Sequence, residues 1–146
     1  MADLASMRNL LMLVVLLGTM ESIVADTRTD PRTKTLSWEL LKTANYGQSS
    51  KEHAAFLVLD GDGEMQLVQW PWEAESLRAS YKGAIPAGTV AIVHTHPNGL
   101  PNPSPGDKAL ALKLALPLYV LTRSSITMTE GGRTELVVRG DWNPSQ

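Results

Sequence analysis

The residues of this chain whose side chains are best suited to metal binding or catalysis lie together between positions 94 and 107. His94 and His96 stand one residue apart at the end of a β-prone run, and Asp107 follows a segment rich in proline and glycine. Alternate residues of a strand face the same side of a sheet, so the two imidazoles point in one direction. Two histidines and a carboxylate, with a fourth position open to water, are typical ligands of a catalytic zinc ion. The sequence therefore predicts one Zn2+ per chain, bound by His94, His96 and Asp107.

The composition excludes a closed thiolate site, because none of the 146 residues is a cysteine. A bound zinc ion polarises a carbonyl and lowers the pKa of its water toward ~7, so we expect hydrolysis. Ser104 lies three residues before Asp107 and would bring a hydroxyl near the metal, where it can donate to the oxyanion of a tetrahedral intermediate. The alternative role of Ser104 is that of a capping or turn serine in a proline-rich loop.

The first 25 residues have the organisation of a secretory signal peptide. Arg8 precedes an apolar run from Leu10 to Met20, and Ala25 offers a small residue at a cleavage position. An uncleaved membrane anchor is an alternative, although Glu21 interrupts the run before the ~20 apolar residues that a span requires. A buried helix is disfavoured, since no polar residue recurs within the run at helical spacing. We expect an exported protein, periplasmic or secreted, that meets a membrane only if this segment stays attached.

The rest of the chain is long enough for one domain with a core, and its pattern indicates an α/β fold. Residues 26–34 are polar and are interpreted as a linker, 35–140 as the domain and 141–146 as a C-terminal tail. Apolar residues at helical spacing predict a first helix over 36–46, with Thr35 as its N-cap and Gly47 as its stop. A Leu/Ala-rich pattern with proline in its first turn predicts a second main helix over 105–116.

Short apolar runs predict the strands of a mixed sheet between these helices. The run that leads into His94 is continuously apolar, which is typical of a strand buried on both faces. A glycine-rich turn at residues 60–63 predicts a hairpin. The predicted strands cover residues 54–59, 65–70, 89–93, 118–122, 126–129 and 136–139, and residues 73–81 are expected to form a helical turn or loop. A formal net charge of −2 without a basic run gives no indication of a nucleic-acid partner.

The motif His94-x-His96-Pro97, followed after six residues by Ser104-x-x-Asp107, resembles the signature of the JAMM (MPN+, Mov34/JAB-type) zinc metallopeptidases. The resemblance is to the small bacterial members and extends over roughly residues 36–132. It implies a cytidine-deaminase-like α/β/α domain with a mixed central sheet and two main helices. It also implies hydrolysis of amide or isopeptide bonds, often those that join ubiquitin-like proteins to lysine.

The resemblance further implies a proton shuttle, which in this family is a glutamate at the start of the strand after the first helix. The matching residue is Glu52, which would act as general base toward the zinc-bound water and then as acid toward the leaving amine. Ala55 stands where the family usually has glycine, and its methyl group is expected to crowd the cleft slightly.

The expected function is therefore that of a zinc-dependent metallopeptidase or isopeptidase with a peptide or protein substrate. One alternative is a non-catalytic MPN-like binding module, and a second is a metallohydrolase of non-amide bonds. The complete ligand set favours an enzyme, because the binding modules of this fold lack it. The chain has no room for the insertions that grip ubiquitin, and an exported protein would not meet the cytosolic ubiquitin-like conjugates of its own cell. We therefore expect substrates in the envelope or outside the cell.

Overall fold

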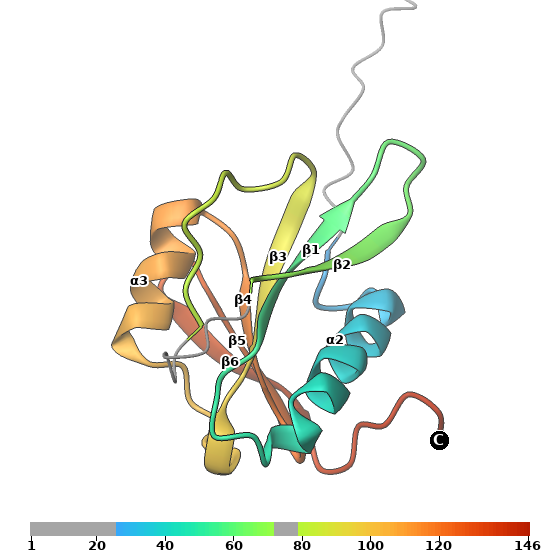
Figure 1. Cartoon of the computed structure of the whole chain (residues 1–146), viewed down its shortest axis with the longest axis vertical. Helices are drawn as coiled ribbons and strands as arrows, with labels where there is room; N and C mark the ends of the chain where they lie inside the picture. The colour runs from blue at the N-terminus through green and yellow to red at the C-terminus, as the bar shows by residue number, and fades with distance from the viewer. Residues whose placement is uncertain (1–25, 72–78) are drawn as a thin grey trace, which may run out of the picture.

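The computed structural model describes residues 26–71 and 79–146, which contain one six-stranded sheet of order β2-β1-β3-β4-β5-β6 (Figure 1). The strands β3 and β4 pair in parallel and all other neighbours pair antiparallel, so the sheet is mixed, as predicted. The strands are β1 (Ala54–Leu59), β2 (Met65–Gln69), β3 (Thr89–Thr95), β4 (Leu118–Thr122), β5 (Ser125–Glu130) and β6 (Arg133–Arg139).

Two α-helices of the described residues cover opposite faces of this sheet, which gives the predicted α/β/α layers (Figure 1). The helix α2 (Pro31–Thr43) packs on a core cluster that contains Ala55, Leu57 and Val93, whereas α3 (Pro105–Leu114) packs on a cluster of alternate residues that includes Phe56 and Ile92. Successive residues of a strand therefore pack alternately into the core under α2 and the core under α3. No helix within residues 26–71 and 79–146 is long and apolar enough to span a bilayer.

The helix α2 begins at Pro31 rather than at the predicted residue 36. Its N-cap is Asp30, whose carboxylate accepts a hydrogen bond of 2.9 Å from the backbone N–H of Arg32, so the prediction of Thr35 as the N-cap is wrong. An Asp-Pro pair is itself a helix start, because the carboxylate caps free amides and proline fits the first turn. The first helical turn thus lies in the segment that was interpreted as a linker.

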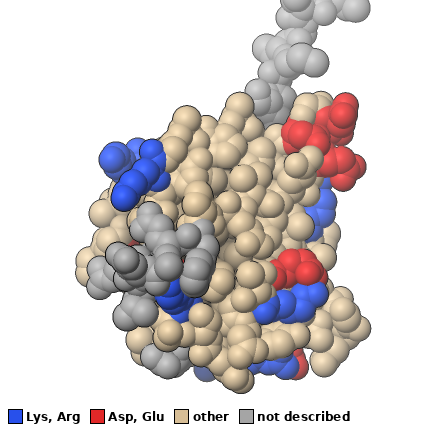
Figure 2. Space-filling model, viewed as in Figure 1, with Lys and Arg blue, Asp and Glu red and all other residues tan. Residues whose placement is uncertain are grey.

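The other boundaries differ from the predicted ones by a few residues. Two short 3-10 turns, η1 (Asn45–Gly47) and η2 (Pro97–Gly99), follow α2 and β3. The strand β3 continues to Thr95 and therefore includes the first histidine of the motif, and β6 begins earlier than expected, at Arg133. The predicted signal peptide and most of the predicted turn at 73–81 lie outside the described residues. On the face shown in Figure 2, charged side chains form small separate groups on a largely uncharged surface.

The C-terminal segment contributes to the core on the α2 side. Trp142 is fully buried, its ring packs edge-on against Trp38 at 4.8 Å, and its Nε1–H donates a 2.8 Å hydrogen bond to the carbonyl of Thr122. The sequence predicts a C-terminal tail at residues 141–146, yet Trp142 within it closes the core between α2 and the end of β4.

Replacing Trp142 with alanine should lower the free energy of unfolding by about 3–5 kcal/mol, because a large buried aromatic side chain and its hydrogen bond are lost. The measurement is urea unfolding followed by circular dichroism. Leu112→Ala is the control, since Leu112 is 56% exposed and its loss should change stability by only about 0.5 kcal/mol. Equal effects of the two substitutions would show that the C-terminal segment adds nothing to the core.

Candidate metal centre

The pairing of β1 with β3 brings the predicted proton shuttle to the two histidines. Ala54 lies opposite His94 in the antiparallel register, and beyond this pair the N–H of Thr95 donates to the carbonyl of His53 at 2.8 Å. The N–H of His53 in turn donates to the Thr95 hydroxyl at 3.0 Å. Because Glu52 precedes Ala54 by two residues, it lies on the same face of the sheet as the two imidazoles.

The two histidines and Asp107 meet where β3 ends and α3 begins. His94 and His96 are buried, with 5% and 8% of their surface exposed. Nε2 of His94 lies 3.5 Å from Oδ1 of Asp107, and Nε2 of His96 lies 3.5 Å from Oδ2 of the same carboxylate. Two ligands about 2.0–2.2 Å from one tetrahedral zinc ion lie roughly 3.3–3.5 Å apart. Each imidazole therefore lies at the separation from Asp107 that two ligands of one ion would have.

Both imidazoles direct Nε2 toward the carboxylate of Asp107. Nδ1 of His96 donates to the carbonyl of Leu100 at 2.9 Å, which places the ring proton on Nδ1 and leaves the Nε2 lone pair available. Nε2 of His94 is buried and makes no hydrogen bond with any described residue, although Asp107 is near. A buried ring nitrogen without a partner is costly in a metal-free protein and is satisfied by a metal ion. The donor set of this chain therefore fits the zinc ion that the motif implies.

Asp107 is held by the start of its own helix. The N–H of Ser104 donates to Oδ2 of Asp107 at 2.6 Å, and the N–H of Asp107 donates to the Ser104 hydroxyl at 3.2 Å, which together form a capping box. Burial by itself raises the pKa of Asp107, but hydrogen bonding to His96, the electrostatic interaction with His94 and the bonds with Ser104 hold that pKa well below its usual range. Asp107 is therefore an ionised carboxylate in a fixed orientation.

Glu52 belongs to the same cluster of side chains as the two histidines. One ligand atom from each of Glu52, His94 and His96 lies within 4.8 Å of the other two, so these three residues could also hold a metal ion. The Oε2 atom of Glu52 accepts a 3.2 Å hydrogen bond from the N–H of Ala79. Asp107 approaches both imidazoles to 3.5 Å, so the described residues offer two carboxylates, Glu52 and Asp107, beside the two histidines.

The cluster opens into a cleft of about 460 Å3 beneath the proline-rich loop. Glu52, His96, Ser104 and Asp107 all line it, so the structure brings these predicted site residues to one cleft, with His94 buried directly behind. The expectation that Ala55 crowds the cleft is wrong, because its side chain faces α2 and is fully buried in the opposite core cluster.

Two groups that orient the site were missed from the sequence. The carbonyl of Leu100 fixes the ring of His96, and the amide of Ala79 holds the carboxylate of Glu52. Both are backbone groups, so no residue type marks them. The one indication in the sequence is the loop after His96, whose proline and glycine residues suggest a rigid backbone that could hold the carbonyl of Leu100 in place.

The fold and the motif have counterparts among known proteins. A family model described as prokaryotic homologs of the JAB domain matches residues 47–136, which include Glu52 and the whole histidine motif. The chain therefore belongs to the prokaryotic JAB/MPN domain family, and the resemblance stated from the motif is confirmed.

One solved structure gives an independent comparison. The crystal structure of a JAB1/MPN domain protein from Archaeoglobus fulgidus has a TM-score of 0.51 at 19% sequence identity, with 70% of this chain and 91% of that chain covered. At this identity the likeness shows the fold, which is the cytidine-deaminase-like MPN/JAB arrangement. A search of curated proteins finds no match.

The roles of the two carboxylates can be separated by zinc binding. We expect Asp107→Asn to weaken zinc affinity at least about a hundredfold, because a charged ligand is lost, and Glu52→Gln to change it only a few-fold. Competition with a chelating dye and zinc content per chain measure both. If Glu52→Gln lost the metal while Asp107→Asn kept it, Glu52 and not Asp107 would be the third ligand.

The metal-free protein should lose stability as the pH falls from about 6.5 to about 4. Burial lowers the pKa of His94 from 6.5 to about 4, so the unfolded chain binds a proton in this range that the folded chain does not. The shift corresponds to about 3 kcal/mol. The pKa of His96 is raised, mainly by its hydrogen bond to Asp107, so its contribution is already complete below pH 6.5 and stays constant.

Urea unfolding of the metal-free protein across this pH range measures the effect. His94→Gln should remove most of the pH dependence. His53→Gln is the matched control and should leave most of it, because His53 lies outside the cluster although burial also lowers its pKa. A wild-type stability that stays constant between pH 6.5 and 4 would contradict a buried neutral His94.

Proposed function

We propose that the protein is a zinc-dependent metallopeptidase that hydrolyses amide or isopeptide bonds in peptide or protein substrates. The observation that supports this most strongly is the buried Nε2 of His94, which lacks a hydrogen-bond partner among the described residues and lies 3.5 Å from the Asp107 carboxylate. Such a set of nitrogen and oxygen donors at the edge of an open cleft is typical of a catalytic rather than a structural zinc site.

A zinc ion held by His94, His96 and Asp107 supplies a Lewis acid and a water of lowered pKa. Glu52 provides the base that such a site needs. Ala79 engages Oε2 of Glu52, while Oε1 has no hydrogen bond to any described residue and is free to take a proton. The same carboxyl group then returns the proton to the leaving amine, which cannot depart as an anion.

Ser104 has a structural role and retains a free donor. Its hydroxyl oxygen accepts the helix-capping bond from Asp107, so the hydroxyl proton can be donated elsewhere. Because Ser104 lines the same cleft, that proton can stabilise the oxyanion that forms when an amide carbonyl is attacked. Capping and oxyanion stabilisation are compatible in one side chain.

The substrate class follows from the cleft and from the N-terminal segment. A volume of about 460 Å3 lies within the range typical of ligand sites, and the cleft can admit a short peptide segment. The signal-peptide pattern of residues 1–25 supports export. The proposed substrates are therefore peptides or protein tails in the envelope or outside the cell.

Cleavage assays with the zinc-loaded protein test this function. We expect hydrolysis within a library of peptides and isopeptides, and a loss of roughly 10²–10⁴-fold in kcat for Glu52→Gln with zinc content unchanged. Glu64→Gln is the matched control, because Glu64 is an exposed glutamate in the β1–β2 turn and should retain full activity. No cleavage of any member, or equal cleavage by Glu52→Gln, would remove the peptidase and leave a metal-binding module.

A further inference from the structure

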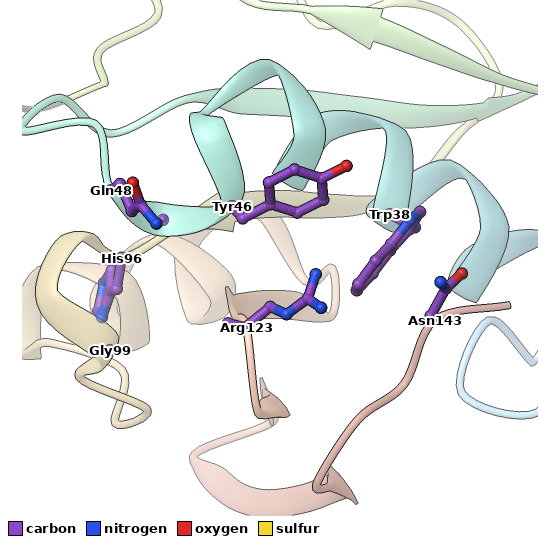
Figure 3. A pocket seen from close by; sticks show the side chains of 8 residues that line it. Trp38, Tyr46, Gln48, His96, Gly99, Arg123 and Asn143 are labelled. Carbon is purple, nitrogen blue, oxygen red and sulfur yellow. The ribbon is translucent and has the colours of Figure 1, made fainter.

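A second hollow lies on the other side of His96, and none of the roles proposed above uses it. Its volume is about 820 Å3, and we call it the Arg123 pocket (Figure 3). Its walls include Trp38, Tyr46, Gln48, Arg123 and Asn143, and it meets the metal centre at His96. These walls come from the segment of α2 and η1, the β4–β5 turn and the C-terminal segment, three parts of the chain that are distant in sequence.

The guanidinium group of Arg123 makes cation–π contacts with two aromatic rings. Its central carbon lies 5.0 Å from the ring centroid of Trp38 and 5.1 Å from that of Tyr46, and Figure 3 shows the group extending toward both rings. Within the described part of the chain, no carboxylate lies within ion-pair distance of Arg123, and none of its N–H groups donates a hydrogen bond. Contact with the rings holds a guanidinium in place and leaves its N–H groups available to bind a carboxylate, which arginine can do with two parallel bonds.

The amide side chains of the pocket also offer donors. Oε1 of Gln48 accepts a hydrogen bond from Asn45 at 3.4 Å, and Oδ1 of Asn143 accepts one from the N–H of Ser145 at 3.0 Å. With both oxygens engaged, the two NH2 groups are the ends left to donate. No acidic side chain is among the described residues that line the pocket. The pocket therefore presents one cation and several donors to a ligand, which is the complement of an anion.

The backbone at Tyr46 is strained in a way that forms this pocket. Tyr46 has φ 56° and ψ 35°, in the left-handed region that bulky residues rarely adopt, and it follows Asn45 at φ 49°. Burial does not explain this conformation, because the Tyr46 side chain is 39% exposed. The left-handed turn instead places the ring against Trp38 and Arg123. Strain of this kind, of order 1–3 kcal/mol, is concentrated at ligand sites.

We propose that the Arg123 pocket binds a carboxylate group of the peptide substrate, with Arg123 as the residue that determines this specificity. The carboxylate belongs either to an acidic side chain of the peptide or to its free C-terminus, and Arg123 would bind both groups in the same way. The pocket adjoins the cleft at His96, so a peptide bound across the metal centre can reach it. The identity of the ligand as substrate rests on the proposed function, whereas carboxylate binding by Arg123 can be measured without catalysis.

Peptide titrations of the 15N-labelled, metal-free protein followed by NMR test the proposal. Metal-free protein is used because a carboxylate would otherwise bind zinc directly. One pair of probes is acetyl-Gly-Gly-Glu-amide against acetyl-Gly-Gly-Gln-amide, which tests an acidic side chain. The other is acetyl-Gly-Gly-Gly with a free carboxylate against its amide, which tests the chain terminus.

We expect the carboxylate member of at least one pair to bind roughly tenfold or more tightly than its amide partner, with shifts at the side-chain amides of Gln48 and Asn143. Arg123→Gln should abolish this preference, and Arg123→Lys should retain part of it. Arg133→Gln should retain all of it, because Arg133 is an exposed arginine in the next hairpin, at the opposite end of β5.

The amide spectrum of each variant shows whether it is folded, so loss of binding is not confused with loss of structure. No preference in either pair, or a preference that survives in folded Arg123→Gln, would overturn the proposal. Failure of the cleavage assays would not alter these titrations, since they involve neither zinc nor turnover.

Discussion

The register between β1 and β3 is the constraint on which the rest of the site depends. Ala54 pairs with His94, and this register places Glu52 and both histidines on the face of the sheet that α3 covers. Two hydrogen bonds between His53 and Thr95 hold the register where the β1–β3 pairing ends. A shift by one residue would turn the carboxylate to the α2 side, since strand side chains alternate. Such a shift is costly because the apolar side chains of β1 belong alternately to the two core clusters, and each cluster would receive the side chains that pack in the other.

Burial of the two imidazoles is costly unless their polar atoms are used. The fold meets part of this requirement by itself, through the carbonyl of Leu100 on His96 and the capping box that fixes Asp107. It leaves Nε2 of His94 without a hydrogen bond to any residue in the described ranges. The domain thus keeps one unsatisfied ring nitrogen at the point where its other donors converge, which is costly for the folded state and is the arrangement that a bound metal ion would satisfy.

The parts of the site that the sequence predicted are those encoded by local spacing. His94 and His96 share a face because strands alternate, and Ser104 caps the helix that carries Asp107 because the two are three residues apart. Glu52 could be placed only through the family resemblance, since a lone glutamate before a strand has no local signature. The helices and strands of the α/β fold followed from apolar periodicity, and the α/β/α layers from the family resemblance. The true start of α2 depended on Asp30, a polar residue that periodicity ignores. The burial of Trp142 and the pocket around Arg123 arise from contacts between distant segments, for which the sequence offers no spacing to read.

The two hollows lie on either side of β3 and differ in their chemistry. The hollow on the α3 side is lined by the ionisable groups of the candidate metal centre, and the hollow on the α2 side by Arg123 and the neutral amide donors. His96 lies at the boundary, because the strand ends there and the chain turns through η2. A β-carbon placed on Gly47, in the strained turn after α2, would lie 3.6 Å from the carbonyl oxygen of His96, so that turn packs directly against the end of β3. The strained end of α2 therefore shapes the second hollow and supports the strand that presents the histidines. Recognition and chemistry would then share one rigid element, which fixes the distance between a bound carboxylate and the bond to be cut.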